Sequence, residues 1–247
     1  GRVDTERQSL WVHRRNFSHI FPRRMATWYM DLTGRGWLES RALWRNIGRL
    51  RDRYEEALDR AVDFSPEVAI IVDERSPYAL APQNTVMRPL GSLIRAQLYR
   101  MGVPARMHYL DDLVAGEVPD CKAYIFLNSF WLDDGQRRAI REEIGGSAAV
   151  FFYGSGYLSD RADTSQMEEL VGVPLRRVEP GPGRLTFRRG DDPLLAGVAG
   201  QSFGKRWELD PLWAVEDAED VTPLAENGRG EPVAGAARTP DGLRVYV

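Results

Sequence analysis

Residues 68–73 read Val-Ala-Ile-Ile-Val-Asp, a continuous run of apolar and mostly β-branched side chains that stops at an acid. A strand that is apolar on both of its faces is typical of the interior of a parallel sheet. Similar short apolar runs occur at 104–109, 121–127 and 148–153. The sequence therefore predicts four buried strands in the middle of the chain.

Helical patterns separate these strands. Residues 89–101 carry apolar side chains at helical spacing and end at Gly102, a common stop residue. A short helix is predicted at 110–116, and another begins at Asp133 with Gln136 in capping-box spacing. The links are too long for hairpins and suit right-handed crossovers. We therefore expect an α/β fold, a flavodoxin-like doubly wound parallel sheet.

The flanking regions differ from this central pattern. Before it, the spacing predicts a helix over 5–21, a buried apolar strand at 26–30 and a long helix from Ser40 to about Val62. After residue 172, Gly and Pro separate short strand candidates, which we interpret as an irregular β extension. The candidates are 175–178, 185–188, 205–209, 212–215, 232–237 and 243–247.

We expect three regions: 1–62, a flavodoxin-like domain over 63–198, and the β extension over 199–247. The last strand candidate reaches the final residue, and the chain opens without Met in the middle of a pattern. We therefore expect a chain that is truncated at both ends.

Composition and charge limit the classes of function. Hydrophobic residues make up 43% of the chain, enough for a sizeable core, and the net charge of -3 does not call for a nucleic-acid partner. A single cysteine, Cys121, excludes an internal disulfide and a cysteine-rich metal site, and no metal is expected. No apolar run is long enough for a membrane span and no signal peptide is visible, so we expect a cytoplasmic protein without a membrane partner.

The carboxyl ends of the strands are where a doubly wound sheet binds ligands. The first strand ends at Asp73 and Glu74, a pair that could hold a metal in a phosphoacceptor domain. The third strand carries Asn128 where such a domain needs an aspartate, and asparagine cannot accept a phosphoryl group. The loop 75–85 has no glycine to cradle a phosphate, so FMN and dinucleotides are disfavoured and no cofactor is expected.

The fourth strand runs into the turn Gly154-Ser155-Gly156, which makes Ser155 the one candidate nucleophile. A full nucleophile elbow would place glycine where Phe152 stands. A serine nucleophile also needs a histidine base within reach. Two of the three histidines precede the domain, and His108 ends a different strand. The turn interpretation is therefore favoured over the catalytic one.

The order of the predicted elements resembles that of a known family. The segments 14–19, 28–32 and 36–37 resemble the final barrel turn of β-galactosidase-like glycoside hydrolases, family 42 and its relatives. Later segments look like the amidotransferase-like trimerisation domain that follows that barrel; they are 68–73, 102–105, 109–113 and 154–156. The similarity runs from about residue 7 to 215, and it implies that a remnant of a (β/α)8 barrel precedes the α/β domain.

The resemblance implies a retaining glycosidase with two catalytic Glu residues on earlier barrel strands, so no catalytic residue is carried over to this chain. Trp28, Asp31 and Trp37 are the candidates for contact with a sugar, since a Trp ring stacks on a pyranose and a carboxylate accepts from hydroxyls. The alternatives are barrel packing for Trp28, a loop cap for Asp31 and a helix staple for Trp37.

The function implied is the non-catalytic C-terminal portion of a glycoside hydrolase, which supports the barrel and a homo-oligomer, a trimer by resemblance. Carbohydrate would bind through the parent barrel. Two alternatives stay open: a stand-alone flavodoxin-like ligand-binding or sensor module, and a Ser-dependent amidotransferase-like hydrolase that uses Ser155. If residues 2–32 pack as an isolated hairpin on the α/β domain with their apolar strand exposed, the first interpretation is favoured. If that strand joins the main sheet, a self-contained module is favoured.

Overall fold

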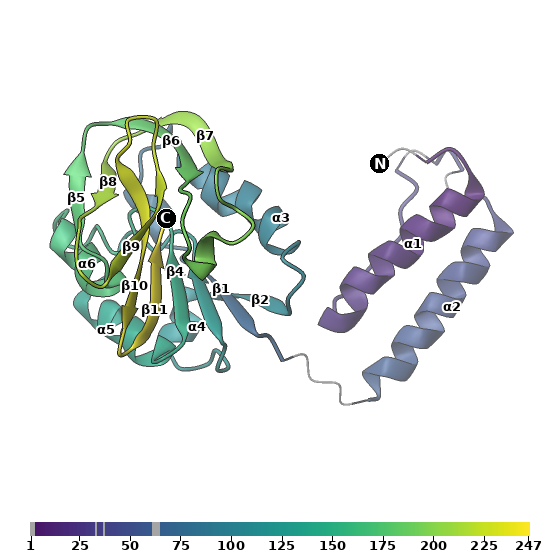
Figure 1. Cartoon of the computed structure of the whole chain (residues 1–247). Helices are drawn as coiled ribbons and strands as arrows, with labels where there is room; N and C mark the ends of the chain where they lie inside the picture. The colour runs from purple at the N-terminus through teal and green to yellow at the C-terminus, as the bar shows by residue number, and fades with distance from the viewer. Residues whose placement is uncertain (1–2, 33, 37, 61–64) are drawn as a thin grey trace. The chain divides into compact units, whose positions relative to one another are not determined.

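Two compact units make up the chain, Gly1–Ser65 and Pro66–Val247. The first is helical and the second combines helices with a large sheet (Figure 1). The computed structural model describes these ranges: 3–32, 34–36, 38–60 and 65–247.

Two helices dominate the first unit, α1 (Glu6–Ile20) and α2 (Arg41–Leu58), with a short 3-10 helix at Phe21–Arg23 after α1. The predicted cap of the second helix is confirmed. The hydroxyl of Ser40 accepts a hydrogen bond from the backbone N–H of Leu43 at 3.2 Å and so satisfies one free donor of the first turn.

The buried strand predicted at 26–30 is wrong. This segment has no regular secondary structure, and the Trp28 side chain is 71% exposed. A strand needs a neighbour to satisfy its backbone groups, and the described part of this unit has two helices and no strand. The expected barrel remnant over 1–62 is therefore a pair of helices, of which the second ends at Leu58; Val62 lies outside the described residues.

The second unit contains eleven strands in two sheets. The strands are β1 (Val68–Val72), β2 (Ala105–Tyr109), β3 (Ala123–Phe126), β4 (Ala148–Phe151), β5 (Leu175–Val178), β6 (Gly181–Phe187), β7 (Ser202–Leu209), β8 (Leu212–Val215), β9 (Val221–Glu226), β10 (Pro232–Thr239) and β11 (Gly242–Tyr246). The main sheet has the order β2-β1-β3-β4-β11-β10-β9-β6-β7, and β5 pairs with β8 in a small second sheet.

The predicted α/β fold class is confirmed. The strands β2, β1, β3 and β4 are parallel and stand in the flavodoxin-like order, and β11 takes the fifth place, parallel to β4. From β11 onward the pairs are antiparallel. The region 199–247, expected as a β extension after the α/β domain, supplies β7 to β11, so its last strand lies inside the main sheet. The strand β9 was not predicted, and the Gly/Pro segment 180–183 proves to lie mostly within β6.

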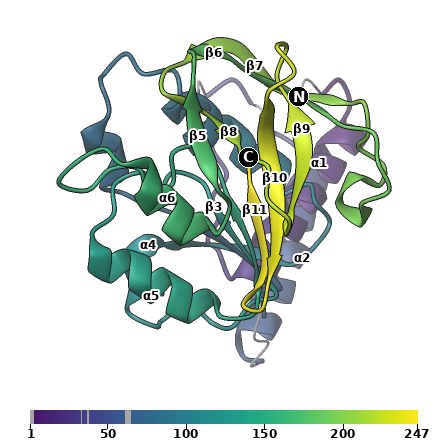
Figure 2. The same ribbon diagram turned by 60° about the vertical axis from the view of Figure 1, so that its left-hand side comes forward.

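Helices cover the two faces of the parallel strands unequally. The helix α3 and the π-helical turn before it lie on one face, and α4, α5 and α6 lie on the other (Figures 1 and 2). The bounds are Pro89–Leu93 for the π-helical turn, Ile94–Leu98 for α3, Leu110–Val114 for α4, Asp134–Ile144 for α5 and Thr164–Val171 for α6. The predicted capping box of Asp133 and Gln136 at the start of α5 is confirmed.

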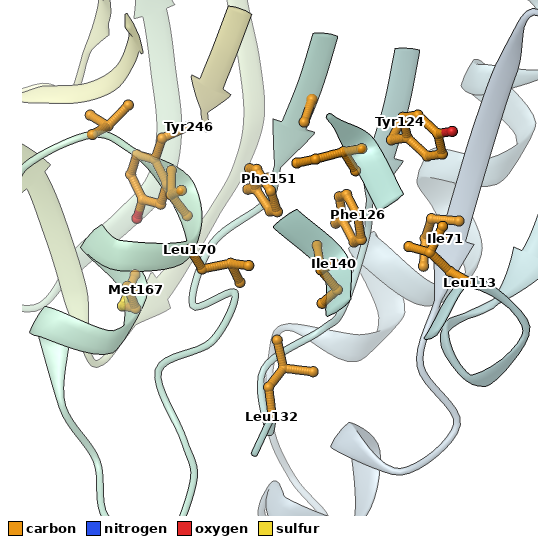
Figure 3. Close-up of a cluster of buried hydrophobic side chains, with 14 of the residues drawn as sticks. Ile71, Leu113, Tyr124, Phe126, Leu132, Ile140, Phe151, Met167, Leu170 and Tyr246 are labelled. Atoms are coloured by element: carbon orange, nitrogen blue, oxygen red, sulfur yellow. The ribbon is translucent and has the colours of Figure 1, made fainter. Parts of the chain in front are cut away.

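Neighbouring residues of each strand enter different cores, because side chains alternate across a sheet. Ile71 packs with α4, α5 and α6, whereas Ile70 packs with α3. Phe126 and Phe151 are fully buried on the face that α4, α5 and α6 cover, with stacked rings 4.7 Å apart (Figure 3). This core holds the carboxyl ends of the parallel strands in fixed positions.

Candidate functional site

The three residues predicted to touch sugar belong to the first unit, and the structure gives them different surroundings. The Asp31 carboxylate accepts hydrogen bonds from the backbone N–H groups of Arg35 at 3.1 Å and Gly36 at 2.7 Å, as a loop cap does. The Trp28 ring is open to solvent. Trp37 lies outside the described residues.

At the ends of β1 and β3, polar side chains are bonded to each other. The Asn128 amide accepts from the backbone N–H of Asp73 at 2.9 Å and donates to the backbone carbonyl of Asp73 at 2.7 Å. The Asp73 carboxylate accepts from the backbone N–H groups of Arg75 and Ser76 and from the Ser76 hydroxyl. These groups close the first loop and leave the carboxylate little capacity for a ligand.

Ser155 stabilises a turn at the end of β4. Its side chain is fully buried, and its hydroxyl donates to the backbone carbonyl of Phe152 at 3.0 Å. Gly156 has φ +78, and a Cβ at this position would lie 2.9 Å from Leu170, so the turn requires glycine here. The geometry favours the turn role that the sequence indicated for Ser155.

His108 is separated from Ser155 by the width of the parallel sheet. It pairs in register with Ile71 on β1, which pairs with Phe126 on β3, which pairs with Phe151 on β4. Three strand spacings amount to about 14 Å, far beyond hydrogen-bond reach. Burial lowers the pKa of His108, and its buried Nε2 has no hydrogen-bond partner among the described residues. His108 is therefore a neutral structural histidine and not the base for Ser155.

A cavity of about 430 Å³ lies beside the ends of these strands. One side is aromatic: Tyr153 and Tyr157 meet Trp213 with ring centroids 5.3 and 4.7 Å apart. Glu208 and Asp210 line another side, and the Asp210 carboxylate also pairs with Arg177 at 3.1 Å. Its size lies within the range of small-ligand pockets.

The residues that line this cavity suit the binding of a ligand. The Tyr153 hydroxyl donates to the backbone carbonyl of Pro211 at 2.6 Å, and burial raises its pKa above the ordinary value, so it stays protonated. Aromatic edges and carboxylate acceptors suit a small polyhydroxylated or cationic molecule. Sequence reasoning missed this site because Glu208 and Asp210 follow Tyr153 by more than fifty residues and reach it only through the β7–β8 connection.

The described residues contain no group of three or more His, Cys, Asp or Glu arranged to hold a metal ion. Over the same residues, no helix has the length and apolar character that a membrane crossing requires.

No protein-family model and no curated protein sequence matches the chain. Solved structures do match its fold. A cold-adapted β-galactosidase from a Rahnella species aligns with a TM-score of 0.60 at 16% identity, over 83% of this chain and 32% of the enzyme. A catalytic mutant of Gan42B, a GH42 β-galactosidase from G. stearothermophilus, aligns with a TM-score of 0.59 at 14% identity, over 88% of this chain and 32% of the enzyme.

A β-galactosidase from the haloarchaeon Halorubrum lacusprofundi also aligns, with a TM-score of 0.51 at 14% identity, over 83% of this chain and 30% of that protein. At these identities the likeness shows a shared fold. The chain spans about a third of the length of these enzymes. Its fold is thus that of one part of GH42 β-galactosidases, as the sequence resemblance indicated.

Proposed function

We propose that this chain is a non-catalytic, C-terminal portion of a glycoside-hydrolase-related protein of the β-galactosidase type. In this proposal the residues that cleave the glycoside lie in another part of a longer protein. The α/β unit supports that part and assembles the protein into a homo-oligomer, a trimer by resemblance. Carbohydrate binds through the parent barrel, and the expected location stays cytoplasmic.

The observation that carries the proposal is the extent of the shared fold. The α/β unit, Pro66–Val247, accounts for 182 of the 247 residues, or about 74%. Matches that cover 83–88% of the chain therefore include part of the helical unit as well. A stand-alone flavodoxin-like module would match through its α/β unit alone.

The surface of the first unit supports the same proposal. In α1 and α2 the buried residues are Leu43 and Asn46. Large apolar side chains lie exposed instead, and they include Trp11, Met25, Trp28, Leu32 and Trp44. Apolar surface of this extent on a small unit is typical of an interface with other parts of a protein. The exposed apolar side chains are therefore consistent with a unit that packs against other parts of a longer protein.

The surroundings of Ser155 argue against the hydrolase alternative, because its hydroxyl is buried, bonded to a carbonyl and remote from His108. The sensor-module alternative is not favoured either. Such a module would need a ligand pocket at the ends of β1 and β3, where Asp73 and Asn128 are bonded to each other.

The test compares this chain with the full product of its gene. We expect a barrel with two Glu residues at strand ends in the longer product, hydrolysis of p-nitrophenyl β-galactoside by that product, and no hydrolysis by residues 1–247 alone. Light scattering after gel filtration measures the expected trimer. Hydrolysis by the isolated chain, or a gene that encodes no barrel, would contradict the proposal.

A further inference from the structure

A second and larger cavity, of about 800 Å³, lies on the α3 face of the main sheet. Its walls come from α3, from the end of β4 and from the β6–β7 pair, which lie near one another in Figure 1. The helix α3 on this face has only five residues. It adjoins the smaller cavity, and Thr85, Val86, Tyr153 and Trp213 line both, whereas Glu208 and Asp210 line only the smaller one.

The walls of this larger cavity are mainly apolar. They include Leu93 on the helical side, Phe152 at the end of β4, and Leu185 on β6. Leu93 is 40% exposed, so an apolar side chain faces the open cavity without cover. A ligand that buries apolar surface here is stabilised by removing that surface from water.

An irregular pairing of β6 with β7 brings further side chains to the cavity. Pro182 pairs with Glu208 and Arg184 pairs with Gly204, so β7 has extra residues between these positions. Gly204 has φ +90, and a Cβ there would lie 2.1 Å from the carbonyl oxygen of Gly183, which makes glycine obligatory. Bulges of this kind redirect side chains. Here Lys205 and Trp207, within the extra stretch, line the cavity.

The charges at the cavity have one sign. Arg184 and Lys205 are the charged residues among those that line it, and no Asp or Glu does so within the described chain. Both cations are exposed, and neither forms an ion pair with another described residue. Apolar walls with two unpaired cations fit a molecule with an apolar body and one anionic group.

We propose that this cavity binds a free amphiphilic anion, such as an aliphatic or aromatic carboxylate or sulfate. The apolar body lies against Leu93, Phe152 and Trp207, and the anion lies at Arg184 and Lys205. A cavity of about 800 Å³ is within the ordinary size range for a small ligand. A free sugar is a poor match because its hydroxyls would lose water against apolar walls. This inference does not depend on the glycoside-hydrolase proposal.

Three probes with the same eight-carbon chain test the proposal: octyl sulfate, octan-1-ol and octyltrimethylammonium, each below its micellar concentration. Calorimetric titration of the 247-residue chain should give the tightest binding for octyl sulfate and the weakest for the cation. Ala96→Trp places a large ring in the cavity from an exposed position of α3 and should weaken octyl sulfate at least tenfold.

Lys205→Ala should weaken octyl sulfate about two- to fivefold and leave octan-1-ol unchanged, as for an exposed ion pair. Arg206→Ala is the matched control, because Arg206 is the next residue, is equally exposed and does not line the cavity. Circular dichroism confirms that each variant folds. Equal affinity for the sulfate and the cation, unchanged binding by Ala96→Trp, or equal losses in Lys205→Ala and Arg206→Ala would each overturn the proposal.

Discussion

Two five-residue segments that are both largely apolar lie in opposite environments. Residues 26–30 read Ala-Thr-Trp-Tyr-Met and have no regular structure, whereas residues 68–72 form β1 with strands on both sides. Trp28 in the first segment is 71% exposed and Ile70 in the second is fully buried. The difference shows that an apolar run becomes a strand only where neighbours satisfy its backbone and cover its faces.

The two units also differ in how much of their apolar surface is buried. The helices of the first form through local hydrogen bonds and a cap at Ser40, and they bury little. The second unit joins segments from 68 to 246 in one sheet and buries apolar cores on both faces of that sheet. Variants in the second unit should therefore change stability far more than variants in the first.

The largest effect should come from Phe151→Ala. This side chain is fully buried and stacked on Phe126, so its removal leaves a cavity and should lower the free energy of unfolding by about 3–5 kcal/mol. Trp28→Ala, which removes an even larger ring at an exposed position, should change it by less than about 0.5 kcal/mol in this chain. Urea denaturation followed by circular dichroism measures both. Equal losses of unfolding free energy in the two variants would contradict the expected difference between the units.

Arg244→Met should have the second largest effect. The buried guanidinium of Arg244 donates to the backbone carbonyls of Gly145 at 2.8 Å, Ser147 at 2.7 Å and Asp241 at 2.7 Å. Methionine keeps most of the volume but leaves these acceptors without their donor, which should cost about 2–3 kcal/mol of unfolding free energy.

The matched control for that variant is Arg238→Met. Arg238 is exposed and pairs with Asp192 at 3.0 Å, a contact expected to contribute about 0–1 kcal/mol. Thermal unfolding of both variants separates the roles of the two arginines. A loss in Arg238→Met as large as that in Arg244→Met would show that burial of the guanidinium is not the cause.

The smallest effect should be a dependence of stability on pH through His108. Burial, together with the charge of Arg106, lowers the pKa of His108 in the folded state. The unfolded state then binds a proton more readily, so stability is complete above about pH 6.5 and falls as the pH drops toward the folded-state pKa. His108→Gln should reduce the loss between pH 7.5 and 5.5, measured by urea denaturation. An unchanged pH dependence would show that His108 does not resist protonation.

Much of the parallel sheet could be predicted from the sequence. The runs at 68–72, 123–126 and 148–151 are apolar, and these and the more polar run at 105–109 are flanked by helices and turn residues, so that local pattern suffices for such elements. The failure at 26–30 has a physical reason, because apolar character alone does not distinguish a strand from an exposed interface segment.

The sites were less predictable. Ser155 could be assigned to a turn from its glycine neighbours and the lack of a nearby histidine in the sequence. Asn128 bonds Asp73 from 55 positions away, and Tyr153 and Glu208, also 55 positions apart, line one cavity. Patterns over a few neighbouring residues do not predict which residues meet over such a separation in the sequence.

The sequence by itself determined the alternation of strands and helices, the caps at Ser40 and Asp133, and the absence of a complete nucleophile motif at Ser155, because each depends on residues within a few positions of one another. Only the tertiary structure decided that β11 lies beside β4, that Arg244 bonds the end of α5, and that Arg184 and Lys205 share an apolar cavity. Those features depend on the closure of long loops, whose outcome is set by how the whole core packs.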